Sequence, residues 1–163
     1  MSEWNRPRAL ALAILEDVEG KGARAEDALD RALTQRPDLD PRDAGLVTEL
    51  VYGTLRHRGT IDHLLTAHMD RPVTKLERRV LLVLRMTAHQ LYWLDRVPAS
   101  AAIDEGVKLL GKDRRRRGFA NAVLRALDRD RRDLLFGEIA DWTERMSARH
   151  SHPRWLVERW EHE

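Results

Sequence analysis

Apolar residues recur every three or four positions along almost the whole chain, and this spacing constrains the fold more than any other feature of the sequence. The clearest stripe comprises Phe119, Ala122, Val123, Ala126 and Leu127, which share one face of a helix. No segment alternates with a period of two between turn signals, so hairpins are not expected. The periodicity therefore predicts an all-α fold of about seven or eight helices.

Two helix starts are indicated by residues that favour helix N-termini. Asp40 followed by Pro41 and Asp43 is typical of a start, with a capping acid and a proline at the first helical position. Thr74 and Glu77 have the spacing of a capping box, and they open a strongly apolar segment that reaches residue 95 without Gly or Pro. A helix that is apolar on most sides belongs in the middle of a bundle. We therefore expect this segment at the centre of the fold.

The 163 residues include no cysteine, which excludes disulfides, cysteine metal sites and a cysteine nucleophile within this sequence. No glycine-rich phosphate-binding motif and no histidine pair with metal-ligand spacing is present. We therefore expect no catalytic, cofactor-binding or metal-binding residue in this chain. The absence of a signal peptide and of a long apolar run predicts a cytoplasmic protein that does not enter a membrane.

The charge is unevenly distributed along the sequence. Residues 71–132 contain 16 Lys and Arg against 7 Asp and Glu, a net charge of +9, whereas the remainder carries −7. A basic middle with acidic flanks suggests a polyanion as partner. The alternative is a solvated helical surface with many ion pairs, and the composition alone leaves both interpretations open.

The strongest candidate for a polyanion site is the arginine run before the helix that we expect to begin near Gly118. Cations at a helix N-terminus oppose the helix dipole, whereas arginines with free backbone N–H groups would suit a phosphate. A run in an exposed loop without function is the alternative. With the basic residues near the first helix and around the end of the third, the candidate RNA-binding residues are Arg6, Arg8, Arg56, Arg58, Arg114, Arg115, Arg116, Arg117 and Arg125.

The segment 151–160 indicates a new helix, on which Trp155 and Trp160 would share one face. Little chain remains for these rings to pack on. The segment either folds back onto the bundle or begins a further domain, and the second alternative is favoured because large exposed aromatic patches are uncommon in complete monomers.

Four ordered motifs carry a family resemblance: residues 48–56, residues 89–91 with 96–98, residues 102–107, and residues 118–125. Together they resemble the NusB-like N-terminal domain of the bacterial 16S rRNA cytosine-C5 methyltransferases of the RsmB family, also called Sun or Fmu. The resemblance implies a NusB-like helical bundle with an RNA-binding role. Gly53 and Asn121 belong to these motifs, and we interpret both as structural, Gly53 in close helix packing and Asn121 as a polar partner near a helix start.

The resemblance also implies a domain organisation and a set of partners. Residues 1–146 would form the RNA-binding domain, and residues 147–163 would be the linker and first helix of a methyltransferase domain that this sequence lacks. S-adenosylmethionine would serve that parent enzyme and not this chain. The expected partners are 16S rRNA or a pre-ribosomal particle, the methyltransferase domain through Trp155 and Trp160, and a ribosomal protein. The alternative is a NusB-type antitermination adaptor that binds boxA-like RNA and a ribosomal protein.

Overall fold

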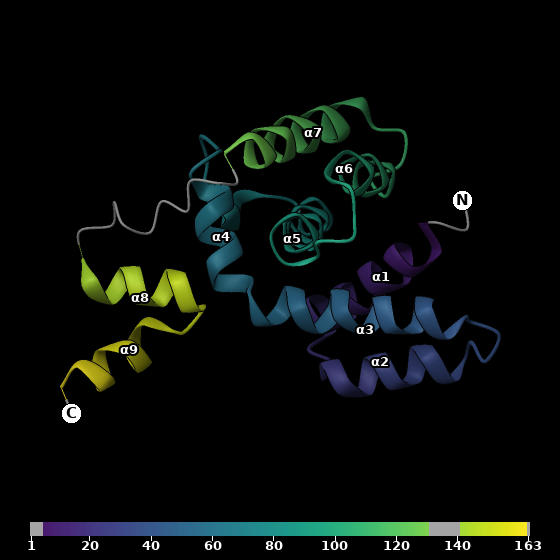
Figure 1. The fold of residues 1–163 in the computed structure, drawn as a ribbon, viewed down its shortest axis with the longest axis horizontal. Helices are drawn as coiled ribbons and strands as arrows, with labels where there is room; N and C mark the ends of the chain where they lie inside the picture. The colour runs from purple at the N-terminus through teal and green to yellow at the C-terminus, as the bar shows by residue number, and fades with distance from the viewer. Residues whose placement is uncertain (1–4, 131–140, 163) are drawn as a thin grey trace.

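The computed structural model describes residues 5–130 and 141–162, which contain helices and no strand. The all-α prediction is confirmed, with nine α-helices and one short 3₁₀ helix in the described residues (Figure 1). The elements are α1 (Arg6–Lys21), α2 (Ala25–Thr34), α3 (Pro41–Arg56), α4 (Arg58–Thr66), η2 (Val73–Lys75), α5 (Arg78–Trp93), α6 (Ala99–Lys108), α7 (Arg114–Arg129), α8 (Trp142–His150) and α9 (Arg154–Glu161).

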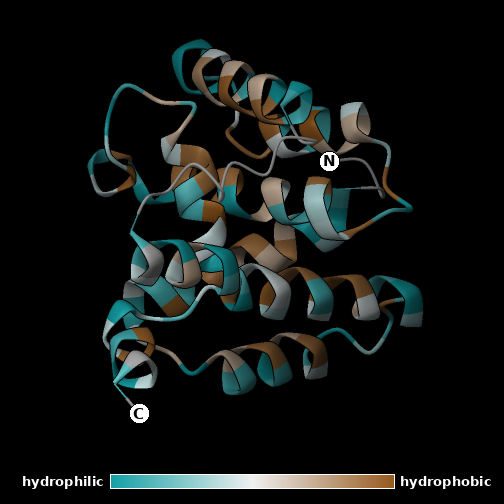
Figure 2. Ribbon diagram, turned by 60° about the vertical axis from the view of Figure 1, so that its left-hand side comes forward, coloured by the Kyte–Doolittle hydropathy of each residue, from teal (hydrophilic) through white to brown (hydrophobic). Residues whose placement is uncertain are grey.

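Helix α5 is the centre of the bundle, as its apolar sequence predicts. All residues from Leu82 to Leu91 are buried, and α5 contacts α1, α3, α4, α6 and α7. Figure 1 shows α5 end-on, with the other helices of the bundle around it. Hydrophobic and hydrophilic residues alternate along most of the surrounding helices (Figure 2). Each outer helix is therefore amphipathic and buries one stripe against the centre.

The two predicted helix starts have different outcomes. Asp40 caps α3 as expected, with its carboxylate accepting a hydrogen bond of 2.8 Å from the backbone N–H of Arg42. The capping box at Thr74 is wrong, because Thr74 lies in η2 and α5 begins only at Arg78. The Glu77 carboxylate instead lies 2.8 Å from Arg116 of α7. Glu77 thus pairs with a residue distant in sequence and does not take part in the capping box that the local pattern predicted.

The C-terminal segment folds back through α8, which packs against α4, and α9 then packs against α8 (Figure 1). Ala148 and Val157 are buried in this arrangement. Trp155 and Trp160 nevertheless remain 64% and 50% exposed. The segment thus folds back onto the bundle through α8, whereas the alternative that it begins a further domain stays a prediction. The expected domain boundary after residue 146 falls within α8.

Candidate functional site

The N-terminus of α7 differs from the sequence prediction in two ways. The helix begins at Arg114 and not near Gly118, so the four arginines form its first turn. The Asp113 carboxylate accepts hydrogen bonds from the backbone N–H groups of Arg115 and Arg116, at 2.9 and 3.2 Å. The expectation of free N–H groups for a phosphate is therefore wrong here. With these two N–H groups occupied, an anion at this end of α7 would be held mainly by arginine side chains.

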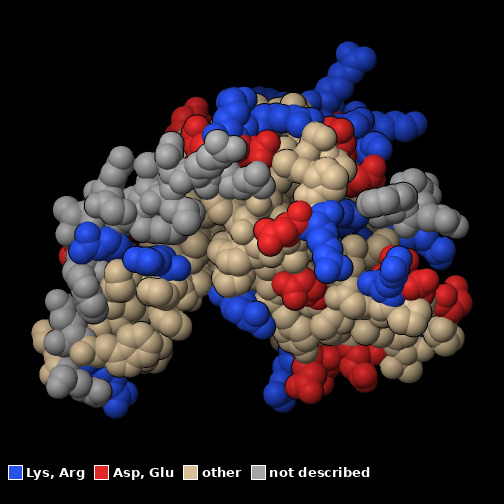
Figure 3. All heavy atoms as spheres, viewed as in Figure 1, with Lys and Arg blue, Asp and Glu red and all other residues tan. Residues whose placement is uncertain are grey.

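Because the run spans a full helical turn, its side chains point in different directions. Arg114 and Arg115 are exposed, and neither forms an ion pair within the described part of the chain. Arg116 lies 2.8 Å from Glu77 and 3.6 Å from Asp113, and Arg117 is half-buried. Figure 3 shows Lys and Arg side chains gathered along the edge of the molecule where Figure 1 places α7. Arg114 and Arg115 are thus the two cations of the run that are most available to an external anion.

A third cation joins this surface from a loop distant in sequence. The Arg71 guanidinium lies 5.1 Å from the centre of the Phe119 ring, in a cation–π contact. Phe119 is one helical turn beyond Arg115, on the same side of α7. Arg71 is not among the site residues predicted from the sequence, since no local pattern links it to residue 119. We call Arg71, Arg114 and Arg115 the α7 basic edge.

The opposite end of the exposed side of α7 is less basic than expected. Arg125 lies 2.9 Å from the Asp104 carboxylate of α6, so its charge is partly compensated. Asn121 is exposed in the middle of α7, so its interpretation as a polar partner near a helix start is wrong. Gly118 is also exposed, and a β-carbon there would meet no atom within 4 Å. The exposed residues between Arg117 and Arg125 are Gly118, Asn121 and Ala122, so this part of the helix surface carries no charge.

Arg56 and Arg58 lie at the corner between α3 and α4, on the side of the molecule away from α7 (Figure 1). Arg56 is exposed, whereas Arg58 pairs with Glu19 at 3.0 Å. The structure does not bring these two residues together with the α7 basic edge. They are weaker candidates for the same RNA surface.

The structure corrects the interpretation of Arg8. Only 2% of this residue is exposed, and its Nε donates a hydrogen bond of 2.9 Å to the Gln90 side-chain oxygen of α5. Burial lowers the pKa of Arg8, and the negative charge of Glu105 partly opposes this shift. The guanidinium is therefore part of the core and does not reach an RNA phosphate on the surface.

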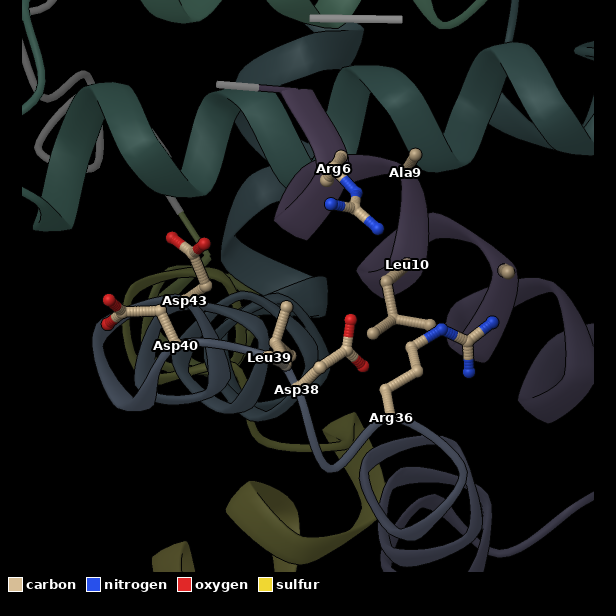
Figure 4. A pocket seen from close by; sticks show the side chains of 9 residues that line it. Arg6, Ala9, Leu10, Arg36, Asp38, Leu39, Asp40 and Asp43 are labelled. Carbon is tan, nitrogen blue, oxygen red and sulfur yellow. The ribbon is translucent and has the colours of Figure 1, made fainter. Parts of the chain in front are cut away.

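Arg6 is exposed and lines a cavity of about 530 Å³ between α1 and the turn that leads into α3. Figure 4 shows the carboxylates of Asp38, Asp40 and Asp43 in the wall of this cavity, with Arg6 above them and Arg36 beside them. Three carboxylates repel a phosphate. The cavity is therefore unsuitable for the RNA backbone, and Arg6 would meet RNA only on its outer side.

A stack of rings closes the corner between α3 and α5. His57 and Trp93 are parallel with centres 4.0 Å apart, and His89 lies 5.6 Å from each of them. His89 Nε2 is 3.1 Å from a Glu49 carboxylate oxygen. Burial lowers the pKa of both histidines, more strongly than the Glu49 charge raises it. An ideal β-carbon on Gly53 would lie 2.1 Å from His89 Nε2, which confirms that Gly53 serves close helix packing.

The described residues meet neither the requirements of a metal site nor those of a membrane-spanning helix. No group of three or more His, Asp or Glu residues there is placed to hold a metal ion. No helix in the described ranges is long and apolar enough to cross a membrane.

Comparison with known proteins places this arrangement among characterised sequences. Residues 5–129 match the sequence model of the NusB family. The chain is 34% identical over 156 residues to a probable ribosomal RNA small subunit methyltransferase B of Bacillus subtilis, covering 94% of this chain and 34% of that protein. It is 39% identical over 142 residues to ribosomal RNA small subunit methyltransferase B of Thermus thermophilus, covering 83% of this chain and 33% of that protein. The chain thus spans about a third of the length of these relatives.

Shorter and structural relatives agree on the fold. Transcription antitermination protein NusB of Coxiella burnetii is 35% identical over 103 residues, which cover 62% of this chain and 75% of that protein. A chain in the crystal structure of the antitermination factors NusB and NusE with dsRNA has a TM-score of 0.69 and 20% identity, over 78% of this chain and 98% of that chain. A chain in the crystal structure of a plectonemic RNA supercoil has a TM-score of 0.73 and 19% identity, over 80% and 97%. With its bundle matched in both sequence and structure, this chain belongs to the NusB family.

Proposed function

We propose that this chain is the RNA-docking domain of a longer, S-adenosylmethionine-dependent 16S rRNA cytosine-C5 methyltransferase, and that it takes no part in methyl transfer itself. The methyltransferase relatives support this proposal because the Bacillus subtilis protein aligns with 94% of the chain. That coverage leaves too few residues outside the alignment to omit the α8–α9 segment. The likeness to methyltransferases therefore extends beyond the bundle that the NusB family model matches.

The single observation that carries RNA binding is the α7 basic edge. Arg114 and Arg115 are exposed and lack an ion-pair partner among the described residues, and Arg71 adds a guanidinium across the Phe119 ring. Guanidinium groups bind phosphate oxygens in two-pronged geometry and release condensed counterions as they do so. Asp113 already occupies the backbone N–H groups, so these contacts would come from side chains.

The partners follow from the same proposal. The ligand would be 16S rRNA or a pre-ribosomal particle, in the cytoplasm. The exposed rings of Trp155 and Trp160 would pack against the domain that follows α9 in the longer protein. The methyl donor would bind in that domain, and we assign it no contact with the residues of this chain.

A second candidate is a NusB-type antitermination adaptor that binds boxA-like RNA together with a ribosomal protein. The NusB relative from Coxiella burnetii and the fold shared with a NusB–NusE–dsRNA complex favour it. It has less support, because the NusB relative covers 62% of the chain whereas the Bacillus subtilis methyltransferase covers 94%.

Fluorescence anisotropy with labelled 16S rRNA fragments tests RNA binding. Replacing Arg114 and Arg115 together with Gln should weaken binding about tenfold or more at low salt, since two phosphate contacts are lost. The matched control replaces two exposed arginines, Arg24 at the N-cap of α2 and Arg31 within that helix, and should leave affinity unchanged. Equal affinities for the two double variants would refute the assignment of the α7 basic edge. Preference for boxA-like RNA over every 16S rRNA fragment would support the adaptor instead.

A further inference from the structure

The N-terminus of α4 is capped by a residue that is distant in sequence and lies near the C-terminus. His57 holds the N-cap position but forms no capping hydrogen bond with its side chain. The Ser151 hydroxyl accepts a hydrogen bond of 2.7 Å from the backbone N–H of Gly59 and a longer one, of 3.4 Å, from that of Thr60. These are the N–H groups that an N-cap side chain normally satisfies. The Ser151 hydroxyl, in the turn between α8 and α9, therefore supplies the side-chain cap that His57 does not provide.

Two further contacts join the same surfaces. The Thr60 hydroxyl donates a hydrogen bond to the Ala148 carbonyl of α8, and both residues are buried. A β-carbon on Gly59 would lie 3.0 Å from Ser151 Oγ and 3.3 Å from Ser151 Cα. A side chain at position 59 would thus push the turn away. The close approach depends on glycine at that position.

The backbone of the turn is shaped for this contact. Ser151 has φ 56° and ψ 33°, and it is the only non-glycine residue with positive φ in the described part of the chain. A residue other than Gly or Asn is unfavourable in this conformation. The next residue, His152, is fixed by two bonds to Ser147, one from its N–H to the Ser147 carbonyl and one from the Ser147 hydroxyl to its carbonyl. Serine is thus less favourable than glycine for the backbone of this turn, but it provides the hydroxyl that caps α4.

We propose that Ser151 is a positioning residue, whose hydroxyl locks the α8–α9 corner onto α4 and so fixes the direction of α9 relative to the bundle. The inference rests on the proposed function, because the segment it would orient is the domain that follows α9 in the longer protein. Relatives about three times as long as this chain supply that segment. Through this lock, the exposed face of Trp155 and Trp160 is held at a fixed orientation to the α7 basic edge, and RNA bound there is aligned with the domain that acts on it.

Spin-label distance measurements test the lock directly. The chain has no cysteine, so two introduced cysteines, Ala67→Cys beside α4 and His162→Cys at the end of α9, carry the labels at exposed positions. With Ser151 present, we expect one narrow distance distribution. Ser151→Ala should broaden it at least twofold, while Ser100→Ala, an exposed serine of α6, should leave it unchanged.

Ser151→Gly separates the hydroxyl from the backbone turn. Glycine adopts the positive φ without strain, but the substitution removes the capping oxygen. If the hydroxyl positions α9, Ser151→Gly broadens the distribution as Ser151→Ala does, and hydrogen exchange at the Gly59 and Thr60 amides rises about tenfold in both variants. A narrow distribution or unchanged exchange in Ser151→Gly would overturn the proposal, since the turn alone would then suffice.

RNA affinity separates this inference from the function on which it rests. Both Ser151 variants should bind 16S rRNA fragments as the unsubstituted chain does, because Ser151 contacts the N-terminus of α4 and not the α7 basic edge. If no variant and not even the unsubstituted chain binds RNA, the proposed function fails while the distance measurement still decides the lock. A loss of RNA affinity confined to the Ser151 variants would contradict the assignment of Ser151 to positioning alone.

Discussion

The imidazole of His89 occupies the place where a β-carbon on residue 53 would lie, 2.1 Å from its Nε2 atom. The two residues belong to different family motifs, and the contact joins α3 to the central helix α5. A second pair repeats the arrangement, since a β-carbon on Gly106 would lie 2.4 Å from the Thr87 hydroxyl oxygen. The motif glycines therefore allow α5 to carry polar side chains against its neighbours within a close-packed core.

Replacing Gly53 with Ala should lower the free energy of unfolding by about 3 kcal/mol, because His89 must move and its contact with Glu49 is strained. Gly45→Ala is the matched control on the same helix, since no atom lies within 4 Å of a β-carbon there. That control should raise stability by up to about 1 kcal/mol through helix propensity. Urea denaturation of both variants measures the difference. A similar change in the free energy of unfolding for Gly53→Ala and Gly45→Ala would show that His89 moves at little energetic cost.

Replacement by Met should lower the free energy of unfolding at Arg8 and leave it nearly unchanged at Arg6. Arg8→Met removes the donor to Gln90 from the core and should cost about 2–3 kcal/mol of stability, with RNA affinity of the folded protein unchanged. Arg6→Met, at an exposed position, should change stability by less than about 0.5 kcal/mol. Denaturation and anisotropy on the same samples check both. If Arg8→Met were stable but failed to bind RNA, the buried assignment of Arg8 would be wrong.

Stability should fall on acidification through the range in which imidazole normally titrates. Burial lowers the pKa of His57 and His89 below the ordinary value of 6.5. The unfolded chain therefore binds more protons than the folded one between the lowered and the ordinary pKa, so stability is greatest above 6.5 and decreases as the pH drops below it. Urea midpoints at pH 7.5 and pH 5 measure the loss.

His57→Phe supplies the control for this pH effect. Phenylalanine keeps a ring against Trp93 but does not titrate, so the variant should lose less stability between the two pH values than the unsubstituted chain. An equal loss in both proteins would assign the pH dependence to groups outside the ring stack.

Local sequence patterns predicted the parts of the fold that depend on local physics. The Asp40 cap and the central position of α5 follow from neighbouring residues and apolar spacing, and both are confirmed. The burial of Arg8 was not predictable, because its hydrogen-bond partner Gln90 is 82 positions away. A charged residue enters a core only when such a partner is already placed there.

The same distinction applies to the candidate site. The arginine run forms the first turn of α7 and does not precede it, and the Asp113 carboxylate accepts hydrogen bonds from N–H groups that the sequence suggested were free. Glu77 neutralises part of the run from α5's N-terminus, and Arg71 adds to the surface from a distant loop. Which charges remain available thus depends on tertiary contacts, and the sequence gives only their number.

The salt dependence of RNA binding reports how many phosphates the α7 basic edge contacts. Each phosphate contact contributes about −0.7 to the slope of log K against log[salt] for single-stranded RNA. If Arg114 and Arg115 each contact a phosphate, replacing both with Gln should make the slope shallower by about 1.4 units, while the Arg24 and Arg31 double variant keeps the original slope. The two double variants should therefore differ in slope by that amount. An unchanged affinity and slope in the Arg114 and Arg115 variant would contradict this prediction and show that the α7 basic edge does not bind RNA.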